Sequence, residues 1–84
     1  MRILLVEDEK RMADALGELL RQEKYEVDCF YDGLSGLAAG ESGIYDMMIL
    51  DVMLPEMDGF EIVKKLRQKR VHTPVLMLTG CHDI

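Results

Sequence analysis

Three short apolar runs, each followed at once by oxygen-bearing side chains, constrain the fold of this chain more than any other feature. They span residues 3–6, 47–50 and 75–78, and they are continuous rather than alternating. Continuous runs of this length are typical of strands buried on both faces of a parallel sheet. A weaker run at residues 27–30 predicts a fourth strand.

The segments between these runs have helical spacing. Residues 10–23 are predicted to form a helix with one apolar face, and residues 34–39 a short glycine-rich helix. The face of the first helix is expected to consist of Met12, Ala13, Leu16, Leu19 and Leu20.

A third helix is predicted to start at Asp58, whose carboxylate can cap the amides of the first turn, with Glu61 three residues on. Its buried stripe is expected to be Phe60, Val63 and Leu66. Strands that alternate with helices must run parallel, because only a long crossover returns the chain to the same direction. We therefore predict an α/β fold with one open parallel sheet covered by helices on both faces.

Charge and length exclude several classes of protein. Sixteen acidic and ten basic residues give a net charge of −6, which disfavours direct binding to DNA. No apolar segment approaches the roughly 18 residues of a membrane span, and the first apolar run is too short for a secretory signal. Cys29 and Cys81 have no motif spacing, so we expect reduced thiols in a cytoplasmic protein without membrane contact.

Oxygen-bearing side chains stand at the carboxyl ends of three predicted strands. Glu7 and Asp8 follow the first, Asp51 closes the third, and Thr79 closes the fourth. Ligand sites of open parallel sheets form at this edge, so these side chains are expected to converge. Carboxylates about 4 Å apart repel by about 4 kcal/mol at an effective dielectric near 20. A hard divalent cation such as Mg²⁺ would relieve that repulsion.

A carboxylate, a cation and a hydroxyl at one edge suit phosphoryl transfer, which depends mainly on positioning and charge neutralisation. Thr79 could bond a phosphoryl oxygen and move with it, which would make a switch. Taken alone, acidic residues 7–9 would indicate an ordinary helix start. The joint pattern, including Pro55 and the Asp58–Gly59 pair, favours a functional site.

Three strings resemble the motif blocks of bacterial response-regulator receiver domains, in the family's order and spacing. They are residues 3–9 (ILLVEDE), 51–59 (DVMLPEMDG) and 74–80 (PVLMLTG). The resemblance covers all 84 residues and is strongest to regulators with a winged-helix DNA-binding output domain. It implies a flavodoxin-like sheet and a phosphoacceptor module, not an enzyme, that serves a two-component system in transcription regulation.

The resemblance also implies a role for individual residues. Asp51 would be the phosphoacceptor for a sensor histidine kinase, and Thr79 the switch hydroxyl. Asp8 and Asp51 would bind Mg²⁺ through carboxylates, Met53 through its backbone carbonyl, and Glu7 through water. Gly80 would leave space for the phosphoryl group.

The family pattern continues beyond this chain, with a fifth strand that carries a lysine and an aromatic switch residue. Residues 1–84 are therefore expected to form a single partial receiver domain of strand order 2-1-3-4, lacking strand 5 and helices 4 and 5, with no output domain. We expect impaired switching, DNA contact only through an output domain outside this chain, and a homodimer that covers the exposed edge of the fourth strand.

Two other functions fit parts of the pattern. A short dimerising interaction protein on a receiver scaffold, without phosphotransfer, is compatible with every residue. A phosphohydrolase of haloacid-dehalogenase type would need a second aspartate two residues after Asp51, where Met53 stands. His72 and His82 have no partners at metal-ligand spacing. Most of the methionines at 47, 48, 53, 57 and 77 fall on strands or beside them, and these are expected to be core residues.

Overall fold

The computed structural model describes residues 1–78, and its four strands form one parallel sheet. The elements are β1 (Arg2–Val6), α1 (Lys10–Gln22), β2 (Glu26–Phe30), α2 (Gly33–Glu41), β3 (Met47–Asp51), α3 (Gly59–Gln68) and β4 (Val75–Leu78). The strand order is β2-β1-β3-β4, and every neighbouring pair is parallel. The predicted fold class and strand order are therefore confirmed.

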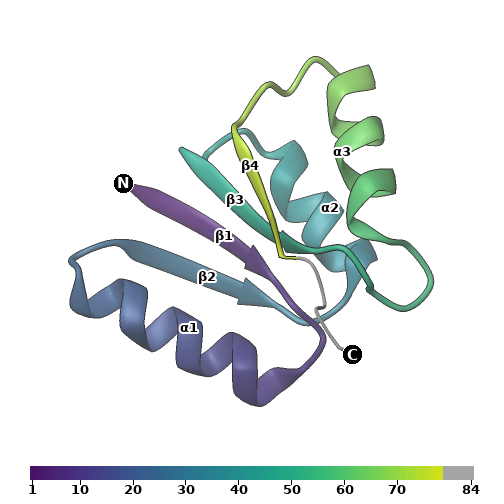
Figure 1. Ribbon diagram of the computed structural model, residues 1–84. Coiled ribbons are helices and arrows are strands. Elements are labelled where there is room, and N and C mark those ends of the chain that lie inside the picture. Colours follow the sequence, from purple (N-terminus) through teal and green to yellow (C-terminus); the bar gives the residue numbers. More distant parts are fainter. Residues whose placement is uncertain (79–84) are drawn as a thin grey trace.

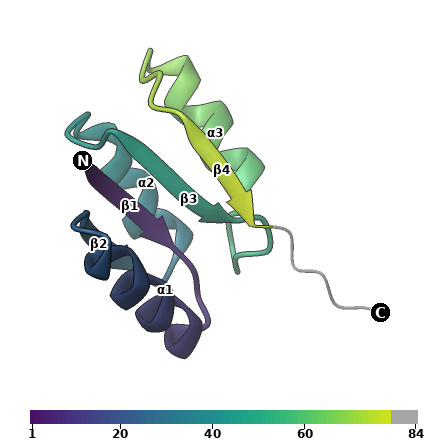
Figure 2. The ribbon, with the colours of Figure 1, turned by 60° about the vertical axis from the view of Figure 1, so that its left-hand side comes forward.

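Helices cover both faces of the sheet (Figures 1 and 2). Helix α1 packs on one face, and α2 and α3 lie side by side on the other. Ile3 and Leu5 of β1 face α1, whereas Leu4 and Val6 face α2 and α3. All four side chains are at most 2% exposed, which explains why this run is apolar without alternation. None of the helices among residues 1–78 has the length and apolar character needed to cross a membrane.

Helix α1 buries a narrower stripe than its spacing predicted. The expectation that Met12 and Leu19 lie on the buried face is wrong, because they are 50% and 58% exposed. The fully buried positions are Ala13 and Gly17, and Leu16 is partly buried against the sheet. Small residues let the helix lie close to the sheet, so longer side chains beside this stripe point to solvent.

Helix α3 begins at its predicted cap but turns a different face inward. Asp58 accepts a hydrogen bond from the Glu61 amide at 2.8 Å, as expected for an N-cap. The prediction that Phe60 is buried is wrong, since its side chain is 62% exposed. Ile62 and Leu66, one turn apart, are the buried pair, and Phe60 lies about 200° around the helix from Ile62.

The predicted core role of the methionines holds for those on or beside the sheet. Met48 is fully buried, and Met47, Met57 and Met77 are partly buried against the core. Met53 is the exception: it is 65% exposed, because it lies in the loop beyond the end of β3. The expectation that most of these methionines pack in the core is therefore confirmed.

Strand β4 is one of the two edge strands of the sheet, and helix α1 does not cover it. Leu76 is 50% exposed, although Ile49, its partner in register on β3, is only 7% exposed. Helix α1 packs against β1 and β2, so it leaves this side of β4 to solvent.

Helix α1 ends in a left-handed turn formed by a residue other than glycine. Lys24 has a φ of 74°, and its amide donates to the Arg21 carbonyl at 2.9 Å. The next amide, of Tyr25, donates to the Leu20 carbonyl at 3.2 Å, which completes a Schellman motif. This position favours glycine, because a Cβ atom clashes with the backbone at positive φ.

Replacing Lys24 by glycine is therefore expected to raise the free energy of unfolding by about 0.5–1 kcal/mol. Urea unfolding followed by circular dichroism would measure the change. The control variant Gln22→Gly places glycine inside the last helical turn and is expected to destabilise by a similar amount. A lower midpoint for Lys24→Gly would contradict the prediction.

Candidate functional site

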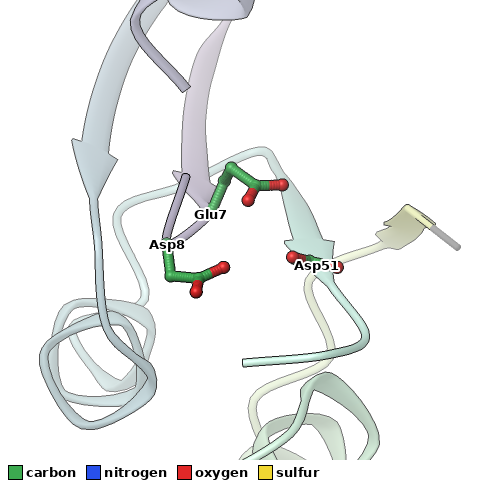
Figure 3. Close-up of side chains that lie close together, drawn as sticks. All are labelled: Glu7, Asp8 and Asp51. Atoms are coloured by element: carbon green, nitrogen blue, oxygen red, sulfur yellow. The ribbon is translucent and has the colours of Figure 1, made fainter. Parts of the chain in front are cut away.

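Three carboxylates meet at the carboxyl ends of β1 and β3. Glu7 and Asp8 follow β1 directly, and Asp51 is the last residue of β3. One carboxylate oxygen from each lies within 4.8 Å of the others, and Figure 3 shows the three side chains pointing toward one another. The structure thus brings together the three acids that were expected to converge at this edge.

The pairing of the two central strands explains this convergence. Val6 pairs with Leu50, so the residues that follow them, Glu7 and Asp51, emerge side by side at the edge of the sheet. Both are buried, with 4% and 8% of their surface exposed, whereas Asp8 is exposed. The cluster therefore has a buried wall and one side open to water.

Backbone amides hold two of the three carboxylates. The Glu9 amide donates to Glu7 Oε2 at 2.9 Å, and the Met53 amide donates to Asp51 Oδ1 at 3.1 Å. The Glu9 carboxylate accepts a hydrogen bond from the Met12 amide at 3.2 Å, so this residue acts as an ordinary N-cap of α1. Within residues 1–78, none of the ion pairs involves a carboxylate of the cluster.

Burial and the neighbouring carboxylates both raise the pKa of Glu7. Its pKa is raised from 4.5 to about 6, chiefly because its side chain is buried. The carboxylates of Asp51 and Asp8 raise this pKa further, whereas the hydrogen bond from the Glu9 amide opposes the shift. The metal-free protein therefore holds a proton at this edge under mildly acidic conditions.

This raised pKa predicts how the stability of the metal-free protein depends on pH. The folded protein binds the Glu7 proton more tightly than the unfolded chain does. The stability that protonated Glu7 contributes is therefore fully present below pH 4.5 and is lost as pH rises through about 6. We expect the free energy of unfolding to fall by an amount on the order of 1 kcal/mol across this window because of Glu7.

Urea unfolding in EDTA at a series of pH values would measure this dependence. Glu7→Gln cannot titrate, so its profile should lack the fall that the wild type shows. An identical slope in the two proteins would contradict the assignment to Glu7.

The donor set at this edge suits a hard divalent cation. It offers three carboxylate groups, and exposed Asp8 leaves room for water, which Mg²⁺ tends to keep among its ligands. In the part of the chain that the structure describes, this is the one group of three or more His, Cys, Asp or Glu side chains close enough to hold an ion.

Of the other predicted site residues, Met53 lies within the described part of the chain. Met53 lies in the loop two residues after Asp51 and contacts it through the backbone amide. Thr79 and Gly80 lie outside the described residues. Sequence reasoning missed the amides of Glu9 and Met53, because any residue type except proline supplies an amide and no side-chain pattern marks it.

Residues 3–84 match the family described as the response regulator receiver domain. Transcriptional regulatory protein TcrA of Mycobacterium tuberculosis is 52% identical over 80 residues, which make up 95% of this chain and 32% of TcrA. PcoR of Escherichia coli, also a transcriptional regulatory protein, is 47% identical over 83 residues, 99% of this chain and 37% of PcoR. The chain thus spans about a third of the length of these curated relatives.

Solved structures share the fold. TrrA from Thermotoga maritima, crystallised in complex with Mg²⁺-BeF, superposes with a TM-score of 0.88 at 36% identity, over 95% of this chain and 70% of that one. The receiver domain of the Francisella response regulator 1452 superposes with a TM-score of 0.90 at 26% identity, over 98% of this chain and 68% of that one.

Proposed function

Because this chain belongs to the response regulator receiver domain family, we propose that Asp51 accepts a phosphoryl group from a sensor histidine kinase in a Mg²⁺-dependent step. The observation that carries the proposal is the approach of Glu7, Asp8 and Asp51 to within 4.8 Å of one another. Receiver domains are signalling modules, and the relatives TcrA and PcoR are transcriptional regulators. The proposed process is therefore two-component signalling that regulates transcription.

The metal ligands follow from the same cluster. Asp8 and Asp51 would bind Mg²⁺ through carboxylates, Met53 through its backbone carbonyl, and Glu7 through water. Bound there, Mg²⁺ would neutralise charge on the acceptor and on the incoming phosphoryl group. Asp8 stands on the exposed side, where the phosphoryl donor must approach, and buried Glu7 closes the opposite wall.

Transfer forms a bond between a carboxylate oxygen of Asp51 and phosphorus while the bond from phosphorus to the donor histidine nitrogen breaks. The electron pair leaves with that nitrogen, which then takes a proton from water. The Met53 amide, 3.1 Å from Asp51 Oδ1, holds the carboxylate in one orientation, and such positioning supplies much of the rate in phosphoryl transfer. Thr79 would then bond a phosphoryl oxygen, for which Gly80 leaves space.

A direct test is to incubate the 84-residue chain with MgCl₂ and acetyl phosphate and to measure its intact mass. Reduction with borohydride would convert the acyl phosphate to homoserine, and peptide mapping should place that homoserine at position 51. EDTA should prevent the adduct. A chain that stays unmodified after long incubation with Mg²⁺ would overturn the proposal.

We also propose that the 84-residue chain associates as a homodimer through β4. The exposed edge strand and its half-exposed Leu76 support this, since an uncovered edge recruits other strands. Size-exclusion chromatography with light scattering should find a dimer, and Leu76→Lys should shift it toward monomer. A folded wild-type monomer at micromolar concentration would contradict the proposal.

The same exposed edge favours one alternative, a dimerising interaction protein that does not transfer phosphate. That function leaves the acidic cluster without a role, so we prefer the phosphoacceptor. Under this proposal, exchange with the kinase takes place in the cytoplasm, and contact with DNA belongs to an output domain outside these residues.

A further inference from the structure

The loop between β3 and α3, residues 52–58, is in close contact with a glycine where it enters α3. Gly59 is the first residue of α3 and is buried. A Cβ atom at this position would lie 2.6 Å from the carbonyl oxygen of Asp51 and 3.2 Å from Val52 Cα. The first of these contacts is shorter than real Cβ atoms make, so α3 rests on the backbone of Asp51 only because residue 59 has no side chain.

A second glycine contacts the same loop from another element. Gly33 is the first residue of α2 and is also buried. A Cβ atom there would lie 2.7 Å from the carbonyl oxygen of Met57 and 3.2 Å from Met57 Cβ. The first residues of α2 and α3 therefore both contact the backbone of Asp51 or of the loop that follows it. Each of these first residues is a glycine.

Hydrogen bonds connect these contacts to the acidic cluster. The Gly59 amide donates to the Val52 carbonyl at 2.9 Å, and the Met57 amide donates to the Pro55 carbonyl at 2.7 Å. Met53 lies in the same loop, between Val52 and Pro55, and its amide donates a hydrogen bond to Asp51 Oδ1 at 3.1 Å. A shift of the loop backbone would therefore move both Met53 and the Asp51 carboxylate.

We propose that Gly33 and Gly59 are positioning residues for the cation site, because they let α2 and α3 hold the 52–58 loop in the conformation that aims Met53 and Asp51 at Asp8. This inference rests on the proposed function. A methyl group at either glycine would push against a backbone carbonyl, not against the end of a flexible side chain, so the loop has to move.

The test is a titration of MgCl₂ into ¹⁵N-labelled wild type, Gly59→Ala and Gly33→Ala, followed by two-dimensional NMR. The resonances of folded molecules report the Mg²⁺ dissociation constant whatever fraction is unfolded. Each variant is expected to bind Mg²⁺ about 10- to 100-fold more weakly, the usual effect of disturbing groups that orient ligands. A merely structural role would lower the folded fraction and leave this constant unchanged.

Gly40→Ala is the matched control. Gly40 is a buried glycine of the same helix as Gly33, but its added methyl group would meet the end of the Met48 side chain and Leu66, not the loop. It should lower stability without changing the dissociation constant. If folded Gly59→Ala or Gly33→Ala binds Mg²⁺ with the wild-type dissociation constant, this inference is overturned while the proposed function stands. A wild type that does not bind Mg²⁺ would overturn the proposed function and this inference with it.

Discussion

Asp51→Asn is expected to abolish the phosphoryl adduct completely while preserving the fold. Asparagine has the shape of aspartate, and its carbonyl oxygen can still accept the hydrogen bond that the Met53 amide gives Asp51 Oδ1 at 3.1 Å. It lacks the anionic oxygen that attacks phosphorus, so the loss is chemical rather than structural. Intact mass after incubation with MgCl₂ and acetyl phosphate measures it.

Asp58→Asn is the control for this experiment. Asp58 stands at the other end of the same loop and caps α3, and asparagine is an equally good N-cap, so the variant should still form the adduct. An adduct on Asp51→Asn in wild-type yield would show that another acid is the acceptor. Asp8 would then be examined first, because it is the exposed member of the cluster.

Asp8→Asn is expected to weaken Mg²⁺ binding about 100-fold and, in EDTA, to stabilise the protein. Removal of one carboxylate ligand leaves the bound cation with less compensating charge, and a 100-fold loss of affinity corresponds to about 2.7 kcal/mol. Without metal, the same charge only repels Glu7 and Asp51, so its removal should add about 1 kcal/mol to the free energy of unfolding.

Isothermal titration with MgCl₂ and urea unfolding in EDTA measure the two effects. Their opposite signs distinguish a lost ligand from a damaged fold, because damage would lower stability as well as affinity. Glu9→Gln is the control, since Glu9 is the next acid along the chain but caps α1 outside the cluster. It should bind Mg²⁺ within about threefold of wild type. Wild-type affinity in Asp8→Asn would refute its role as a ligand.

The amino-acid sequence by itself determined the order of the elements and the edge of the sheet at which the acids gather. Continuous apolar runs separated by helical spacing leave few arrangements other than a parallel sheet with crossover helices. All strands of such a sheet end at one edge, so Glu7, Asp8 and Asp51 could be assigned to one place before any distance was known. Their approach to within 4.8 Å follows from the pairing of β1 with β3.

Only the tertiary structure decided which side of each helix is buried and which backbones touch. Periodicity fixes the angle between two side chains around a helix axis, but not the direction in which the sheet lies, so Met12 and Phe60 were placed inward and are exposed. The contact of Gly59 with the Asp51 carbonyl is likewise set by how closely α3 packs on β3. That distance depends on both elements at once, and neither segment specifies it alone.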